Sequence, residues 1–202
     1  MFEIQQDYEA KKAAIISGAI KAILHIFETR QLDCINHYCS QAFYVFTIKN
    51  SSEIDRMIVG MKPFPGLIRL LSHTNTQVLS NAISSINNIV LSGTLTTMPN
   101  IPHPHYDSIA AVDGKNQLFN FFKRNNISKL SKNQASMVIW RIFRQREMTN
   151  IEQLQYLVAY LKNSLYEDDD WIKQTSKEGL QNLAQNAKNR SEITKGGFII
   201  PK

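Results

Sequence analysis

The side chains best suited to metal or nucleophilic chemistry fall in two short stretches. The first holds Cys34, His37 and Cys39. A thiolate beside an imidazole is the combination that zinc sites and cysteine nucleophiles use. Cys34 and His37 can share a helix face, but Cys39 lies one turn further on, in a row of packing residues, and no third group orients the imidazole. We therefore expect buried, unreactive thiols here, and neither a zinc site nor a catalytic pair.

The second stretch is GTLTTMPNIPHPHYDS, residues 93–108, which contains His103, His105 and Asp107. Three potential ligands on one loop supply no fourth ligand and no fixed geometry for zinc. The prolines and polar residues of this stretch are typical of a surface loop. The sequence therefore predicts a proline-stiffened loop with solvated histidines and no bound metal.

The composition and the absence of motifs exclude several further classes. The sequence has no Gly-rich phosphate loop and no nucleophile elbow, so we expect neither an enzyme nor a cofactor. No apolar segment approaches the roughly 20 residues that span a bilayer, and the first residues, MFEIQQDYEAKK, lack an apolar signal core. We expect no membrane contact and a location in the cytoplasm, the nucleus or both.

Charged runs occur at two places in a chain whose net charge is +6. The run EDDDW, residues 167–171, is interpreted as the acidic start of a helix, with an acidic patch for a basic partner as the alternative. The run WRIFRQRE places Arg141, Arg144 and Arg146 after Trp140. It is interpreted as the solvated side of a helix end, with a basic spot for an acidic peptide or RNA as the alternative.

The elements that must position these residues are helices, because apolar residues recur at helical spacing along the chain. One pattern has apolar residues at i, i+3, i+6 and i+7, and it occurs four times with one polar exception: Ile20, Ile23, Ile26, Phe27; Phe64, Leu67, Leu70, Leu71; Lys115, Leu118, Phe121, Phe122; and Leu154, Leu157, Tyr160, Leu161. The regular return of this pattern predicts a repeat array rather than a single compact core.

A second pattern follows each copy of the first, with a small residue at i+4 and large residues at i+8 and i+11. Its copies, again with one polar exception, are Ile35, Cys39, Phe43, Phe46; Val78, Ala82, Ile86, Ile89; Ser131, Ala135, Ile139, Ile142; and Ile172, Ser176, Leu180, Leu183. Their starts are 43, 53 and 41 residues apart, and two of these steps fall in the range of about 40–47 residues of long helical repeats. Residues 93–108 account for the longer step.

The small residue at i+4 has a physical reason. Where one helix crosses its neighbour closely, a large side chain overpacks the contact and costs about 1–3 kcal/mol. Cys39, Ala82, Ala135 and Ser176 are all small, which indicates that the second helix of each pair crosses its neighbours at this position.

These features resemble the armadillo repeat family, most clearly in the segments IVGMKPFPGLIRLLSHTNTQVLSNAISSINNIVLSG (58–93) and QTSKEGLQNLAQNAKNRSEITKGGFI (174–199). The resemblance implies an all-α, right-handed α-solenoid of about four repeats, with approximate boundaries at 14–57, 58–108, 109–150 and 151–192. Residues 193–202 are expected to start a further repeat, so that residues 1–202 form one array within a longer one; a C-terminal segment that folds back is the alternative. Third helices of such repeats line a concave groove that binds extended peptides.

In peptide-binding armadillo proteins of the importin-alpha kind, the groove carries a row of Trp and, one turn later, a row of Asn. The resemblance places the Asn row at Val45, Asn88, Arg141 and Asn182, and the Trp row at Gln41, Ser84, Met137 and Glu178. Two Asn positions match and no Trp position does. The missing aromatic slots argue against recognition of basic nuclear signals.

We therefore expect a non-enzymatic scaffold that binds a protein or peptide in this groove. Arg141 lies in the middle of the Asn row, and a guanidinium there favours a carboxylate or phosphate, so an acidic or phosphorylated ligand is expected. The alternatives are a basic α-solenoid that binds nucleic acid, and a regulatory array within a larger protein. No oligomeric state is predicted.

Overall fold

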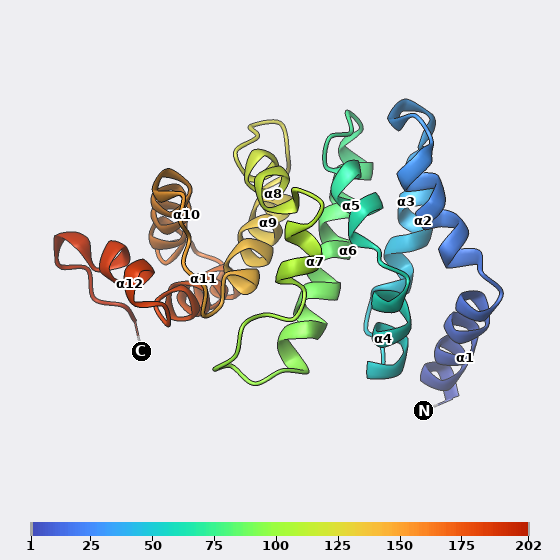
Figure 1. Ribbon diagram of the computed structural model, residues 1–202, viewed down its shortest axis with the longest axis horizontal. Coiled ribbons are helices and arrows are strands. Elements are labelled where there is room, and N and C mark those ends of the chain that lie inside the picture. Colours follow the sequence, from blue (N-terminus) through green and yellow to red (C-terminus); the bar gives the residue numbers. More distant parts are fainter. Residues whose placement is uncertain (1, 202) are drawn as a thin grey trace.

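The computed structural model describes residues 2–201, with side chains from Asp7 onward, and shows helices without a strand in that range (Figure 1). The α-helices are α1 (Phe2–Ile16), α2 (Ala19–Thr29), α3 (His37–Phe46), α4 (Ser52–Gly60), α5 (Phe64–Leu70), α6 (Thr76–Leu95), α7 (Tyr106–Ala110), α8 (Gly114–Phe122), α9 (Lys129–Ile142), α10 (Ile151–Ser164), α11 (Asp170–Leu183) and α12 (Ala187–Ile193). The predicted all-α class is confirmed. None of the described helices is long and apolar enough to cross a bilayer.

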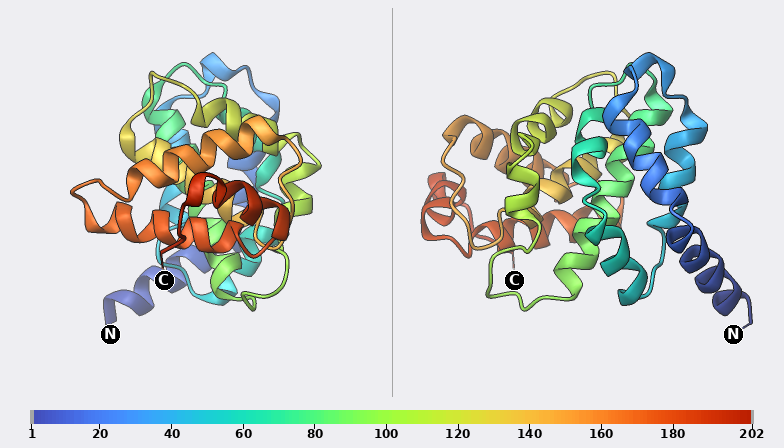
Figure 2. Two further views of the ribbon diagram at one scale, coloured as in Figure 1. Left: turned by 90° about the vertical axis from the view of Figure 1, so that its left-hand side faces the viewer. Right: turned by 45° about the vertical axis from the view of Figure 1, so that its right-hand side comes forward.

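The helices stack along one axis, from α1 at one end to α12 at the other (Figures 1 and 2). The helices that carry the second apolar pattern form a continuous row, because α3 packs on α6, α6 on α9 and α9 on α11. The helices of the first pattern form a second layer, in which α5 packs between α2 and α8. The structure is therefore an elongated solenoid, in which each helix of the row packs on the next helix of the row.

Each helix of the row starts at a residue that caps it. The side chains of Asn36, Asn75, Ser128 and Asp169 accept hydrogen bonds from backbone N–H groups in the first turns of α3, α6, α9 and α11. These bonds satisfy donors that a helix start otherwise leaves unpaired. The acidic run before α11 is thus the helix start that the sequence indicated.

The predicted small-residue row lies where the long helices cross. Ala82, Ala135 and Ser176 are buried, and Cys39 is half-buried.

Ala82→Leu is expected to lower the free energy of unfolding, measured by urea denaturation, by about 2 kcal/mol through overpacking between α6 and its neighbours. Thr76→Leu is the control, because Thr76 is exposed. Thr76 is the first residue of α6, so the control lies on the same helix. Equal losses in both variants would contradict this packing.

The loop after α6 differs from the expected solvated loop. His103 and His105 are buried, and a ring nitrogen of His103, Nε2, lies 3.0 Å from the carbonyl oxygen of Val90 on α6. Gly93 makes room for the pair, because a Cβ there would lie 2.8 Å from His105 Nε2. Burial lowers the pKa of His103 to about 3. The expectation of solvated histidines is wrong because the loop packs back on α6.

Neither candidate metal stretch forms a metal site in the part of the chain that the structure describes. No group of three His, Cys, Asp or Glu side chains there is placed to hold an ion. Asp107 points away from the histidine pair to Arg146, at 3.5 Å. Cys34 is exposed in the short 3-10 turn Leu32–Cys34, and Cys39 is only half-buried, so the expectation of buried thiols is wrong. A turn, rather than a helix, carries Cys34 outward.

The segment after α12 folds back on the solenoid instead of starting the second helix of a further repeat. Phe198 and Ile200 pack against the hydrophobic core, and Gln181 on α11 donates a hydrogen bond of 2.8 Å to the carbonyl oxygen of Pro201. Only the 3-10 turn Lys195–Gly197 follows α12 in the described residues. This agrees with the alternative of a folded-back segment; Lys202 lies outside the described residues.

Candidate functional site

The eight predicted groove residues lie on the four helices of the row, as the pattern required: Gln41 and Val45 on α3, Ser84 and Asn88 on α6, Met137 and Arg141 on α9, and Glu178 and Asn182 on α11. The successive packing of these helices places the eight residues along the row; a shared groove face stays a prediction. They are not equally accessible. Gln41 and Val45 are exposed, whereas Ser84, Met137 and Arg141 are buried.

Several polar residues of the row connect neighbouring helices rather than stand free. Asn88 Nδ2 donates to Oγ1 of Thr47, the residue that follows α3, at 3.1 Å. Ser84 Oγ donates to Gln134 Oε1 on α9 at 2.9 Å. Asn182 donates to the carbonyl oxygen of Glu178 on its own helix at 2.8 Å. Each matching Asn therefore uses one of its two amide donors within the chain, and its second N–H and its carbonyl oxygen remain for a ligand.

Arg141 does not lie open beneath a ligand, as the sequence suggested. Arg141 is only 5% exposed. Its Nη1 donates a hydrogen bond to Asn87 Oδ1 at 2.8 Å, and its guanidinium stacks on the Trp140 ring, 4.7 Å from the ring centre. Burial lowers the pKa of Arg141 to about 10, while the charge of Glu178 opposes this shift. Its Nε is buried and has no hydrogen-bond partner among the described residues. Arg141 is buried rather than open because α9 packs so closely between α6 and α11 that the side chain is enclosed.

The other two arginines of this run do not form a solvated basic spot either. Arg144 is buried and donates to the carbonyl oxygen of Ile101 at 3.0 Å and to Thr97 Oγ1 at 2.8 Å. Arg146 stacks 4.0 Å from the centre of the Tyr106 ring. Both side chains hold neighbouring loops and helices, so they are structural.

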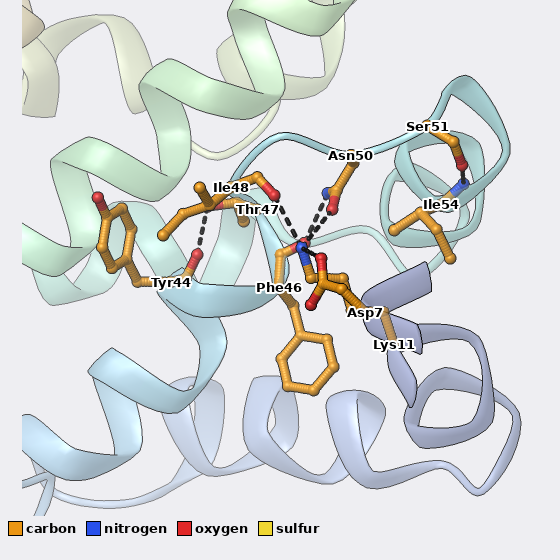
Figure 3. Close-up of polar contacts among 9 residues, drawn as sticks. All are labelled: Asp7, Lys11, Tyr44, Phe46, Thr47, Ile48, Asn50, Ser51 and Ile54. Atoms are coloured by element: carbon orange, nitrogen blue, oxygen red, sulfur yellow. Dashed lines mark hydrogen bonds and ion pairs between the residues drawn. The ribbon is translucent and has the colours of Figure 1, made fainter. Parts of the chain in front are cut away.

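A hollow with a volume of about 460 Å³ lies beside Asn88, between α3, α4 and α6. We call it the Asn88 slot, and its lining residues are Tyr44, Thr47, Ile48, Lys49, Asn50, Ser52, Asp55, Asn88, Leu91, Ser92, Leu95 and Thr96. Figure 3 shows the part of this region where α3 ends and the chain passes to α4. The slot is large enough for a long side chain and its flanking backbone.

Apolar side chains form two opposite ridges of the Asn88 slot. Tyr44 near the end of α3 and Ile48 just after it form one ridge, and Leu91 and Leu95 on α6 form the other. Leu91 and Leu95 are four residues apart and share one helix face. Leu95 is 76% exposed, so this ridge is open to a partner. The ridges offer a surface on which the aliphatic stem of a long side chain can pack.

Two hydrogen-bonded pairs add a polar lining between the ridges. The first is Thr47 with Asn88, and the second is Ser92, whose hydroxyl donates to Asp55 Oδ2 on α4. Asn88 and Ser92 lie about one helical turn apart on α6. Two acceptors of these pairs have no partner in the described chain, Asn88 Oδ1 and the second carboxylate oxygen of Asp55. These two atoms suit a donor cation.

The sequence missed Asp55, Tyr44 and Ser92 as site residues. Asp55 lies in the first turn of α4, where an acidic residue is explained by the helix dipole alone. Its role depends on the contact between α4 and α6, which brings a short helix to a long one. No local pattern in the sequence marks that contact.

Comparison with known proteins identifies the fold. No protein-family profile and no curated protein matches the sequence. Solved structures do match, including a designed armadillo repeat protein in complex with a (KR)4 peptide, with 13% identity, a TM-score of 0.66, and coverage of 94% of this chain and 75% of that one. Computationally designed armadillo repeat proteins for modular peptide recognition match with 16% identity, a TM-score of 0.66 and the same coverage. An engineered protein matches at 17% identity and a TM-score of 0.67, over 94% of this chain and 44% of its own length.

Proposed function

Because the chain folds as a right-handed, armadillo-like repeat solenoid, we propose that it is a non-enzymatic scaffold that binds an extended segment of another protein. The segment lies along the row α3, α6, α9 and α11, in the cytoplasm or nucleus. The observation that carries the proposal is the Asn88 slot, which combines open apolar ridges with unused acceptors. That structural neighbours are described as binding or recognising peptides supports the same class of ligand.

The chemistry of the slot selects a lysine or arginine side chain of the partner. Its stem packs between Tyr44 and Leu91, and its cationic head donates to Asp55 and Asn88. A charge-assisted hydrogen bond to a partly buried carboxylate is stronger than one between neutral groups. The ligand therefore has a basic residue at this end of the row.

An acidic or phosphorylated residue of the ligand is proposed further along the row, where the charge of the enclosed Arg141 attracts it without direct contact. The guanidinium is buried with a single hydrogen bond, and that bond goes to the neutral amide of Asn87. A buried cation without an anionic partner is costly, and a ligand anion reduces that cost. The partner segment thus carries opposite charges at two separate points.

Binding to an array of short peptides tests the slot through Asp55→Asn. This variant keeps an acceptor for Ser92 but removes the negative charge. We expect about ten-fold weaker binding of peptides with a single Lys or Arg anchor, the loss typical of one charged hydrogen bond. Asp168→Asn is the matched control, because Asp168 is exposed and remote from the slot. Equal binding by wild type and Asp55→Asn would overturn the slot as the anchor.

The same array distinguishes the remaining alternatives. Arg141→Gln is expected to lose the preference for peptides with an acidic residue beyond the basic anchor. An unchanged preference would overturn the role of Arg141. A nucleic-acid-binding protein would instead bind generic RNA with an affinity that falls steeply with salt and does not change in Asp55→Asn. That result, with no peptide bound, would replace the peptide proposal.

A further inference from the structure

Helix α1 lies at one end of the stack, and one of its lysines is enclosed by the chain that forms the wall of the Asn88 slot. The side chain of Lys11 is 7% exposed. Its ammonium donates to the carbonyl oxygen of Ile48 at 2.8 Å and to Asn50 Oδ1 at 3.2 Å, and lies 3.0 Å from Asp7 Oδ2 (Figure 3). An ammonium has three donors, and these three partners use all of them.

Two of these partners belong to the connection between α3 and α4, residues 47–51, which we call the connector. The connector separates two hollows. Ile48, Lys49 and Asn50 line the Asn88 slot, while Lys49, Asn50 and Ser51 line a second hollow of about 270 Å³ on the side of α1. A wall with open space on both sides has little packing to hold it, so its position depends on hydrogen bonds.

Thr47 bonds back to Tyr44 and Ser51 caps α4, but the middle of the connector, residues 48–50, has few hydrogen bonds of its own. Asn50 Nδ2 donates to the carbonyl oxygen of Phe46 at 2.6 Å, and the backbone N–H of Ile48 reaches Val45 at a long 3.4 Å. Lys49 adopts a φ of 46°, in the left-handed region that side-chain-bearing residues rarely occupy. From outside the connector, Lys11 holds Ile48 and Asn50, and Asn88 on α6 holds Thr47 at the connector's start.

We propose that Lys11 is a positioning residue for ligand binding: by holding Ile48 and Asn50, it fixes the wall and the apolar ridge of the Asn88 slot. This inference rests on the proposed function of the slot. Lys11 does not line the slot and does not touch its ligand. Without its ammonium, the connector moves toward one of the two hollows, Ile48 leaves its ridge, and the Thr47–Asn88 contact shifts with it.

The probe for this proposal is N-acetyl-arginine methylamide, titrated into isotopically labelled full-length chain and followed by NMR. N-acetyl-citrulline methylamide is its neutral control of the same shape. We expect the arginine probe to shift the signals of Leu91, Leu95 and the Asn88 side-chain amide, and the citrulline probe to shift them far less. Lys11→Met, which keeps the aliphatic stem, is expected to weaken arginine-probe binding about ten-fold.

Two further variants separate positioning from loss of structure. Lys11→Arg keeps the cationic donors and is expected to bind within about two-fold of wild type. Lys21→Met is the matched control, because Lys21 is exposed on α2. Hydrogen exchange of the connector should accelerate in Lys11→Met while exchange in α6 and α9 stays as in wild type. Wild-type affinity and unchanged connector exchange in Lys11→Met would overturn the proposal, as would a failure of Lys11→Arg to restore binding.

The readouts also distinguish this proposal from the proposed function. If wild type does not respond to the arginine probe, the slot is not a cation site and the proposed function loses its anchor. The effect of Lys11 on connector exchange then decides its positioning role by itself. If wild type responds and only Asp55→Asn weakens binding, the slot stands and Lys11 is not its positioning residue.

Discussion

The Gly114→Ala variant is expected to lose about 3 kcal/mol of unfolding free energy, a large effect for the addition of one methyl group. Gly114 is the first residue of α8, and a Cβ there would lie 2.6 Å from the carbonyl oxygen of Ile109 and 2.7 Å from its Cγ2. The preceding residue, Asp113, has a φ of 54°, which folds α8 tightly back on α7. A backbone oxygen cannot rotate away as a side chain does, so the corner between the two helices must open.

Gly60→Ala is the matched control, because it makes the same chemical change at the end of α4. No atom lies within 4 Å of a Cβ built on Gly60. Alanine favours helix over glycine by up to about 1 kcal/mol, so this variant is expected to be neutral or slightly more stable. Urea denaturation followed by circular dichroism measures both. A loss of similar size in the two variants, or none at Gly114, would contradict the close contact of α7 and α8.

The fold was predictable because its main determinants are local. The spacing of Val78, Ala82, Ile86 and Ile89 places one face of α6 against its neighbours, and each of these residues is buried as the pattern requires. The same spacing pattern also indicates the shorter helices and the tight breaks between them. The approximate repeat boundaries remain predictions, since the helices do not define where one repeat ends.

The site was predictable only as a face of the solenoid. Asn88 and Arg141 lie on successive helices of the row, α6 and α9. Asn88 reaches Thr47, which follows α3, and Arg141 reaches Asn87 on α6. Sequence spacing fixes the helix face on which a residue lies, but not which neighbouring helix a long side chain reaches. The depth of Arg141 and the contribution of Asp55 depend on how closely α4, α6 and α9 pack, and no local pattern records that distance.

The loop that carries His103 and His105 is a second place where the sequence did not predict how deeply side chains are buried. Proline and histidine in a polar stretch are typical of a solvated loop, yet His103 and His105 fill the space above Gly93. The signal for this contact was the glycine inside an otherwise regular helix, which indicates close approach of another group. Only the structure shows that the approaching group is an imidazole pair from the loop itself.

Acidification from pH 7.5 to pH 5 is expected to lower the unfolding free energy by about 2 kcal/mol through His103 alone. Burial, the charges of Arg144 and Arg141, and the neighbouring His105 all lower the pKa of His103, from 6.5 to about 3, although its contact with Val90 opposes them. Between these values the unfolded chain binds a proton that the folded chain does not. Stability is therefore full above about pH 6.5 and declines as the pH falls toward 3. The pKa of His105 is lowered by burial as well, which adds in the same direction.

Urea denaturation at a series of pH values, with wild type and His103→Gln, measures this effect. Glutamine keeps a donor for the Val90 carbonyl oxygen but has no proton to gain, so the variant should show a shallower dependence between pH 7.5 and pH 5 whatever its stability at neutral pH. His25→Gln is the control, because His25 is exposed on α2 and its loss should leave the dependence unchanged. If wild type and His103→Gln have the same pH dependence, His103 is not held neutral against α6, and the loop does not pack as described.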